Sequence, residues 1–373
     1  MRQIIAVCLA LIGLVAPSVS AATDTVTTSA GPVRIDAVAG PFEHPWAVAF
    51  LTSDNALLVT ERGGTVWHIA PGGARQRVRG VPASVQTGQG GLLDVVPARD
   101  FAETREVFLS YAAPDGRRTR TTLTAARLSA DGARLTDLRV LFAQDPAIRS
   151  SRHFGSRIVE APDGTLYVTV GDRGEPELAQ DPRATIGKVM RVTRAGTVPP
   201  DNPFVGDPAV DDQIWSLGHR NPQGAGLDET GRLWIVEHGA RGGDEINLPQ
   251  PGRNYGWPRI SYGTHYSGLP HPASAAPGLE QPLFYWDPSI APSGLAVYSG
   301  ALWSDWAGDL FVGALKSGVL VRLDRQGSEI LGEERLLDGA YGRIRDVREG
   351  PDGALWFLTD SDRGALYRIS PAE

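Results

Sequence analysis

The stretch TGRLWIVEHG (230–239) has a turn, then a run of apolar and aromatic residues, then small and polar residues. A short run rich in β-branched and aromatic side chains, bounded by turn residues, predicts a β-strand. The same pattern recurs along the chain in SDNALLVTE (53–61), TREVFLSYA (104–112), DGTLYVTVGD (163–172), AGDLFVGAL (307–315) and DGALWFLTD (352–360). The recurrence indicates a repeat of six units.

A second apolar segment precedes each of these strands. The six segments are PWAVAFL (45–51), GGLLDVV (90–96), SRIVEAP (156–162), GAGLDE (224–229), GLAVYSG (294–300) and IRDVREG (344–350). Six units of short antiparallel strands predict an all-β fold, a six-bladed β-propeller. The early segment VRIDAVAG (33–40) is expected to complete the last blade beside the C-terminal strands, which would close the ring and remove an exposed edge.

The composition agrees with a fold that has many turns and few helices. The chain has 44 Gly and 28 Pro, and no segment after the N-terminus has a sustained helical periodicity of apolar residues. We expect residues 23–373 to form one propeller domain. Two long insertions, 173–213 and 239–290, interrupt the repeat, and loops of that length in a compact domain are typically functional or disordered.

The first residues, MRQIIAVCLALIGLVAPSVSAA (1–22), predict a signal peptide. Arg2 is its charged start, residues 4–15 are apolar, and small residues precede the cleavage zone. The mature protein is therefore expected to be periplasmic or secreted. Cys8, the single cysteine, would be removed with the signal, so neither a disulfide nor a cysteine-ligated metal is expected.

The net charge argues against one class of partner. The formal charge is −7, and removal of Arg2, the only charged residue of 1–22, makes it −8. Nucleic-acid-binding domains are typically basic, so no nucleic-acid partner is expected.

Propeller geometry brings distant residues together. The first strand of each blade lines the central channel, so the residues just before these strands gather at one mouth. Those positions hold Gln89, His153, Arg157, Arg220, Asn221, Trp286, Ser289, Arg343 and Arg345, and Lys316 is expected to reach the same rim. Guanidinium groups bind carboxylates in a bidentate manner and stack on flat rings, so a planar ligand with several carboxylates would suit this set. The imidazole of His153 would be a general base.

Each of these residues also has a plain structural interpretation. A single histidine before a strand often packs in a turn, Arg343 and Arg345 could be solvated charges of an edge strand, and Arg220 with Asn221 could close a turn. The GQGG sequence at Gln89 is not a dinucleotide fingerprint, because no helix follows it. Their equivalent positions in the repeat favour function.

The 239–245 loop is a candidate cation site. Asp244 and Glu245 follow Gly242–Gly243, and backbone carbonyls around 238–240 and at Tyr255 could add the hard oxygen ligands that calcium prefers. The spacing is not that of an EF-hand, and a solvated acidic turn remains an equal alternative.

Eight motifs resemble the soluble PQQ-dependent aldose sugar dehydrogenases, relatives of soluble quinoprotein glucose dehydrogenase. They are GQGGLL (88–93), HFGSR (153–157), VGD (170–172), GHRNPQG (218–224), EHG…GDEINL…GRNYGWP (237–258), APS (291–293), LKSGV (315–319) and GRIRDV (342–347). The resemblance covers residues 35–370, and the motifs occur in the family's order.

The resemblance implies an enzyme that oxidises aldoses at C1 to lactones, with hydride transfer to PQQ bound over the channel mouth and calcium beside it. His153 would be the general base, Asp172 the acid that orients it, and Arg220 the residue that stabilises charge on the quinone oxygen. Cofactor-binding positions would be Gln89, Arg220, Asn221, Lys316, Arg343 and Arg345. Gln89 and Trp286 are expected to contact the sugar. The Gly239 and Ala240 carbonyls would bind the calcium beside the cofactor. Glu245 and Tyr255 would bind a second, structural calcium.

The chain departs from the family pattern at several points. Ala240 stands where the glucose enzyme has proline, Arg152 replaces an acid, and the long insertions near the fifth blade are mostly missing. The missing insertions favour a monomeric enzyme with a broad range of aldoses. A soluble or membrane-bound electron acceptor is the other expected partner.

Two other functions are open. A non-catalytic propeller could bind carbohydrate or protein, and a metal-dependent lactonase also uses this fold. The lactonase would need a mouth rich in carboxylates, whereas these positions are cationic.

Overall fold

The computed structural model describes residues 23–271 and 273–372, so the predicted signal peptide at 1–22 lies outside the described residues. Within those residues no helix is long and apolar enough to cross a membrane. In the part of the chain that the structure describes, helical structure is limited to the short segments α1 (Phe101–Thr104), η1 (Pro176–Ala179) and η2 (Ser304–Trp306).

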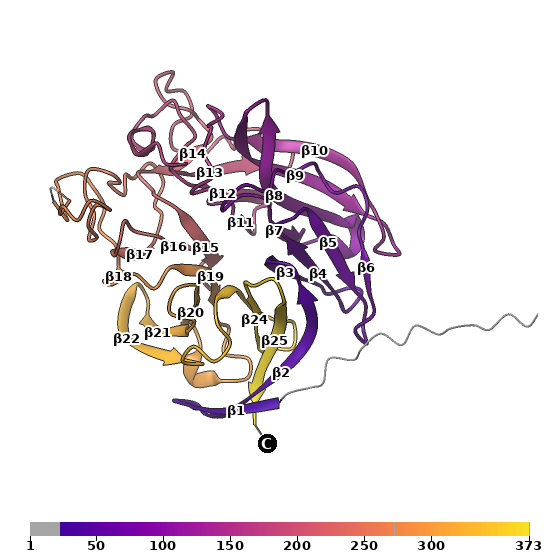
Figure 1. Ribbon diagram of the computed structural model, residues 1–373. Helices are drawn as coiled ribbons and strands as arrows, with labels where there is room; N and C mark the ends of the chain where they lie inside the picture. Colours follow the sequence, from indigo (N-terminus) through magenta and orange to yellow (C-terminus); the bar gives the residue numbers. More distant parts are fainter. Residues whose placement is uncertain (1–22, 272, 373) are drawn as a thin grey trace, which may run out of the picture.

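Six β-sheets surround a central channel, which confirms the prediction of an all-β six-bladed propeller (Figure 1). The first blade contains β3 (Pro45–Leu51), β4 (Ala56–Glu61), β5 (Thr65–Ile69) and β6 (Arg75–Arg77). The second contains β7 (Leu92–Pro97), β8 (Glu106–Asp115), β9 (Arg118–Leu128) and β10 (Leu135–Ala143). The third contains β11 (Ile158–Glu160), β12 (Thr165–Val170), β13 (Lys188–Thr193) and β14 (Ile214–Leu217). The fourth contains β15 (Pro222–Leu227), β16 (Leu233–Glu237), β17 (Asp244–Asn247) and β18 (Phe284–Trp286). The fifth contains β19 (Pro292–Val297), β20 (Leu310–Ala314), β21 (Leu320–Gln326) and β22 (Glu329–Leu336).

The sixth blade joins the two ends of the described chain. Its strands are β23 (Ile344–Glu349), β24 (Leu355–Thr359), β25 (Gly364–Pro371), β2 (Gly31–Phe42) and β1 (Thr23–Thr28). Strand β2 pairs antiparallel with β25, from Val33 opposite Pro371 to Phe42 opposite Gly364. The expected closure of the ring by the early strand is confirmed, and it removes an exposed sheet edge.

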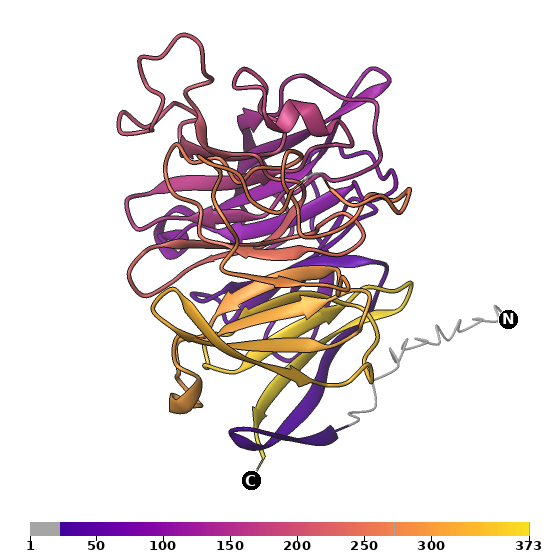
Figure 2. The ribbon, with the colours of Figure 1, turned by 90° about the vertical axis from the view of Figure 1, so that its left-hand side faces the viewer.

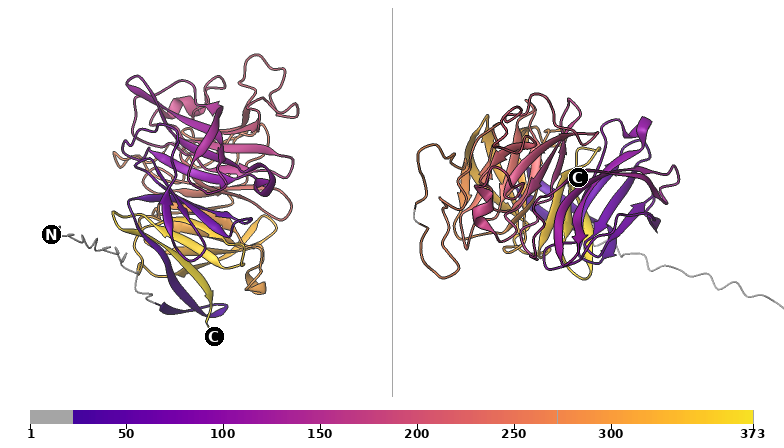
Figure 3. Two further views of the ribbon diagram at one scale, coloured as in Figure 1. Left: turned by 90° about the vertical axis from the view of Figure 1, so that its right-hand side faces the viewer. Right: turned by 90° about the horizontal axis from the view of Figure 1, so that it is seen from above.

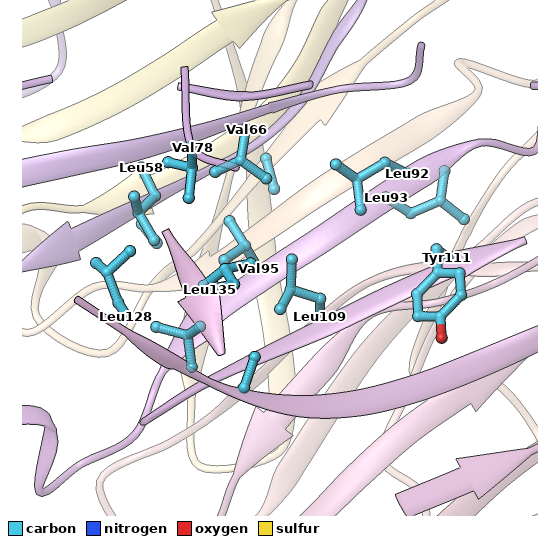
Figure 4. Close-up of a cluster of buried hydrophobic side chains, with 14 of the residues drawn as sticks. Leu58, Val66, Val78, Leu92, Leu93, Val95, Leu109, Tyr111, Leu128 and Leu135 are labelled. Carbon is cyan, nitrogen blue, oxygen red and sulfur yellow. The ribbon is translucent and has the colours of Figure 1, made fainter. Parts of the chain in front are cut away.

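Apolar side chains fill the space between neighbouring blades. Leu58 and Val66 of the first blade meet Leu92, Val95 and Leu109 of the second in one buried cluster (Figure 4). Burial of such a side chain contributes about 2 kcal/mol. The blades thus stabilise one another and hold their inner strands, and the residues just before them, in fixed positions.

The two faces of the ring differ. On one face of the ring, tight turns such as 51–56 join the first strand of each blade to the second. On the opposite face lie the connections from one blade to the next and those from the second strand of a blade to the third. Much of the long insertions consists of loops, as the side views show (Figures 2 and 3). The candidate site is on this second face.

Candidate active site

His153 is held by a sharp local turn. The backbone adopts left-handed conformations at His153 (φ 50°), Gly155 (φ 64°) and Ser156 (φ 86°) just before β11. A Cβ at Gly155 would lie 2.7 Å from the Thr169 carbonyl oxygen, so the HFGSR motif requires glycine here. The turn fixes the imidazole at the entrance of the channel.

Asp172 orients the imidazole. It follows β12, and its Oδ1 lies 2.6 Å from His153 Nδ1. The carboxylate also accepts hydrogen bonds from the Gly174 N–H (2.7 Å) and from Trp257 Nε1 (2.8 Å). With Nδ1 engaged as the donor, His153 Nε2 is the nitrogen with a free lone pair.

The electrostatic surroundings keep this histidine neutral. Burial lowers the pKa of His153, the nearby Arg220 lowers it further, and the hydrogen bond to Asp172 opposes them only in part. Burial alone would raise the pKa of Asp172, but the His153 hydrogen bond and nearby positive charges bring it below its ordinary value. At neutral pH the pair is therefore an imidazole hydrogen-bonded to a carboxylate, which suits a general base.

Gln89 connects the second blade to this turn. Its side-chain Oε1 accepts a hydrogen bond from the backbone N–H of His153 (2.7 Å), and its backbone N–H donates to the Ser151 carbonyl (2.9 Å). Its side chain thus reaches the site as expected.

Arg220 and Asn221 lie just before β15. The Arg220 N–H donates to Glu237 Oε2 (2.7 Å), its Nη1 donates to the His238 carbonyl (3.1 Å), and its guanidinium lies 5.2 Å from the Trp257 ring centroid. Arg220 Nε is buried and has no partner among the described residues. Asn221 Oδ1 accepts from the N–H of Gly155 (3.2 Å).

The sixth blade contributes two further guanidinium groups. Nη2 of Arg343 and Nη2 of Arg345 lie 3.2 and 3.3 Å from Asp360 Oδ2, and His44 Nδ1 lies 2.9 Å from Oδ1 of the same carboxylate. Burial lowers the pKa of Arg345 to about 10, so it stays charged at neutral pH. Lys316, after β20, is exposed at the rim.

Several site residues were missed from the sequence. Arg62 donates to the Gly88 carbonyl (2.9 Å) and interacts electrostatically with Arg345 and Asp360. Gln223 accepts from Arg345 Nη1 (3.1 Å). Arg62 and Asp360 directly follow the second strands of their blades, and Asp172 lies two residues after its second strand, so this end of the strand was the signal that could have found them.

Positive charge dominates the mouth. Arg62, Arg220, Lys316, Arg343 and Arg345 are cations of the mouth, and the carboxylates beside them are Asp172, Glu237 and Asp360. The Nε atoms of Arg62, Arg220 and Arg345 are buried and have no partner among the described residues. Buried donors in native proteins are nearly always satisfied, so these guanidinium groups favour an anionic ligand.

Three expected mouth residues lie elsewhere. Trp286 ends β18, the outermost strand of its blade, and is buried with its Nε1 3.1 Å from Glu333 Oε2, so the prediction that it contacts the sugar is corrected. The reason is that residues 284–286 form a fourth strand, which the repeat pattern did not indicate. Ser289 donates to Asp244 (2.6 Å), and Arg157 lies inside the channel, 1% exposed.

Asp244 has no free oxygen for a cation. Its Oδ1 accepts from the Gly239 N–H (2.9 Å), and its Oδ2 accepts from Ser289 Oγ and from the N–H groups of Ile290 and Ala291. It therefore holds the loop rather than a metal.

A small acidic cavity lies beside it. About 10 Å³ is open there, close to the size of one water molecule or ion, and Glu237, Glu245, Gly239 and Tyr255 are among its lining residues. Burial and the neighbouring Glu237 raise the pKa of Glu245 to about 8. Asn247 donates to both glutamates (3.0 Å each), and its buried Oδ1 has no described partner.

These oxygens fit a single hard cation such as calcium. Within residues 23–271 and 273–372 no three His, Cys, Asp or Glu side chains form a metal cluster, so backbone carbonyls of the lining residues would have to complete the ligands. The Ala240 carbonyl accepts from the Thr264 N–H (2.9 Å), and Ala240 is not among the residues that line this cavity.

The chain is similar to known dehydrogenases over most of its length. A family profile described as Glucose / Sorbosone dehydrogenase matches residues 42–368. The chain is 42% identical over 345 residues to the aldose sugar dehydrogenase YliI of Escherichia coli K12, covering 91% of this chain and 93% of that protein.

Solved structures agree. The soluble aldose sugar dehydrogenase of Escherichia coli, in its apo-form, matches with a TM-score of 0.88 at 41% identity, covering 91% of this chain and 100% of that chain. The PQQ-bound aldose sugar dehydrogenase of Streptomyces coelicolor matches with a TM-score of 0.76 at 27% identity, covering 95% of this chain and 100% of that chain.

Proposed function

The chain belongs to the Glucose / Sorbosone dehydrogenase family, and from this premise we propose that it is a PQQ-dependent dehydrogenase that oxidises aldoses at C1 to lactones. The observation that carries the proposal is the pairing of a neutral His153, whose Nε2 is free, with a mouth rich in cations. A base and an anion-binding surface at one entrance are what such a reaction needs.

The residues of the mouth suit PQQ, a flat ring system with several carboxylates. Arg343, Arg345 and Lys316 would bind the carboxylates, Arg220 would lie against the quinone oxygens, and Asn221 would complete the contacts. The unpaired Nε atoms of Arg220 and Arg345 support this assignment. When bound, PQQ supplies the oxidant that takes up the hydride from the sugar.

His153 removes the proton from the anomeric hydroxyl at Nε2. Asp172 accepts the hydrogen bond from Nδ1 and stabilises the imidazolium that results, because its carboxylate is ionised and 2.6 Å away. Gln89 holds the His153 backbone and offers its amide to the sugar. Arg220 stabilises negative charge that develops at the cofactor.

Calcium would occupy the Glu237–Glu245 cavity, where burial and the neighbouring Glu237 raise the pKa of Glu245 and a cation would offset both effects. We assign the enzyme to the periplasm or the extracellular space because residues 1–22 predict a signal peptide, and we propose a monomer that passes electrons to a soluble or membrane-bound acceptor.

The proposal is tested by reconstitution. Purified apoprotein with added PQQ and calcium should reduce a redox dye when glucose or another aldose is supplied. If PQQ restores no turnover with any aldose of a panel, the proposal is wrong. Saturable sugar binding without turnover would support the non-catalytic propeller instead, and lactone hydrolysis without quinone would support the lactonase.

A further inference from the structure

A second cavity opens on the same face, next to the mouth. Its volume is about 350 Å³, within the usual range for small-molecule sites. It lies between the β8–β9 hairpin and the segments just before Gln89 and His153. The lining residues are Val85, Thr87, Gly116, Arg117, Arg118, Thr119, Ile148, Arg149, Ser150 and Ser151. Three of these are arginines and none is acidic.

The cavity is joined rigidly to the reaction site. Thr119 and Ile148 exchange two backbone hydrogen bonds (3.0 and 3.1 Å), and Ser151 accepts from the Gln89 N–H (2.9 Å). Ser151 is two residues before His153, so their Cα atoms are at most about 7 Å apart. One wall of the cavity therefore lies two residues from the base.

The positive charges at the rim are unpaired. Arg117, Arg118 and Arg149 are exposed and form no ion pair with any described residue. The acids that flank them in sequence, Asp115 and Asp145, are both bound by Arg120 (2.7 and 2.9 Å). These carboxylates therefore leave the rim charges uncompensated.

A buried cation lies under the floor. Arg173 is 0% exposed, and its donors go to uncharged oxygens, including Thr119 Oγ1 (2.9 Å) and the Ser150 carbonyl (2.9 Å). Burial lowers its pKa to about 10, so it is charged at neutral pH. A buried guanidinium without a carboxylate partner is costly, and it adds positive potential beneath the cavity.

The hydroxyl of Thr119 is directed by this arrangement. It accepts from Arg173, and its own hydrogen is donated to none of the described residues. Thr119 can therefore donate to a ligand while the rim arginines supply charge.

We propose that this cavity is an anion subsite of the active centre, which binds the carboxylate or phosphate of a reactant whose other end lies at His153. The inference rests on the proposed dehydrogenase function. The anion belongs either to an acidic aldose, bound at the end remote from C1, or to an anionic electron acceptor. Both carry the same chemistry, and guanidinium groups bind it in a bidentate manner.

A direct test uses inorganic phosphate titrated into the apoprotein by calorimetry. Arg117→Gln/Arg149→Gln should weaken binding about tenfold or more, because charge-assisted hydrogen bonds are lost. Arg134→Gln is the matched control, since Arg134 is exposed beyond the other end of β9, and it should bind as the wild type does. No phosphate binding by the wild type, or equal affinity in the double variant, overturns the subsite.

Kinetics then identify the reactant. With cationic phenazine methosulfate as acceptor, the ratio of kcat/KM for glucose 6-phosphate to that for glucose should fall about tenfold in the double variant if the sugar carries the anion. With glucose as substrate, the ratio of ferricyanide to phenazine methosulfate reduction should fall instead if the acceptor does. If neither ratio changes, the subsite takes no part in the reaction. If the wild type binds phosphate but turns over no sugar with either acceptor, the proposed dehydrogenase function is contradicted and the anion site is not.

Discussion

The mouth and the interior of the channel are both lined by arginines, but their charges are arranged differently. In the interior, Arg157 Nη1 lies 3.1 Å from both Asp94 and Asp346, and Arg348 lies 2.9 and 3.1 Å from the same two carboxylates. The two cations and two anions balance. They come from the second, third and sixth blades, so the network connects distant parts of the ring.

At the mouth the balance is lost. Asp360 is shared by Arg343, Arg345 and His44, while Arg220 and Lys316 form no ion pair with a described carboxylate. A balanced buried network holds a structure together, whereas uncompensated charge at an opening favours a ligand of opposite sign. The difference separates residues that maintain the fold from residues that perform the chemistry, and it leads to tests in both regions.

The largest effect is expected at the mouth. His153→Ala should lower kcat roughly 10²–10⁴-fold, because the general base is removed. The temperature of unfolding should stay close to that of the wild type, because Asp172 keeps its hydrogen bonds from the Gly174 N–H and from Trp257 Nε1. Steady-state kinetics and a thermal melt measure the two quantities. A variant that keeps more than about a tenth of the turnover contradicts the role of the base.

The interior should respond in the opposite way. Arg157→Met should lower the free energy of unfolding by about 3 kcal/mol, because Asp94 and Asp346 lose a buried partner. Urea denaturation measures this change. Arg134→Met, at an exposed site, should change it by less than about 0.5 kcal/mol. Equal stability of the two variants would show that the network does not hold the blades.

Calcium removal tests the acidic cavity. At a calcium concentration of 100 times Kd, the wild type should gain about 2.7 kcal/mol of stability, and a chelator should remove it. Glu245→Gln should respond much less, because the substitution removes a charged ligand from the cavity. Identical thermal melts of the wild type with calcium and with chelator would rule out a calcium site.

The smallest effect is expected from the pH dependence. Burial lowers the pKa of His153 below its ordinary value, so kcat/KM should fall as the pH drops through that lowered pKa and the base becomes protonated. In Asp172→Asn the carboxylate that raises this pKa is lost, so the acid limb should move to lower pH. The plateau should also fall, about tenfold, because the imidazolium is less stabilised. An acid limb that moves to higher pH would contradict the assigned pair.

The sequence predicted the parts of the fold that depend on local pattern. Alternating turns and apolar runs identified the six blades, and the early strand at 33–40 was expected beside the C-terminal strands, where β2 lies. The prediction that residues just before the first strand of each blade gather at one mouth is confirmed for Gln89, His153 and Arg220.

The repeat pattern did not indicate the outermost strand of each blade. Residues 284–286 pair with β17 as an outer strand, which removed Trp286 from the mouth. Partners far apart in sequence, such as Arg345 with Asp360 or Arg157 with Asp94, depend on the closed ring, so no spacing rule could assign them. The hydrogen bonds that saturate Asp244 likewise come from residue 239 and from residues 289–291, in the connection between the fourth and fifth blades.

The central claim is that the uncompensated mouth binds an anionic cofactor while the balanced interior only holds the fold. Calorimetric titration of the apoprotein with PQQ, in the presence of calcium, tests it most directly. We expect one PQQ per chain, with affinity about tenfold weaker in Arg343→Met and unchanged in Arg134→Met. An apoprotein that takes up no PQQ, or the same affinity in both variants, would contradict the account.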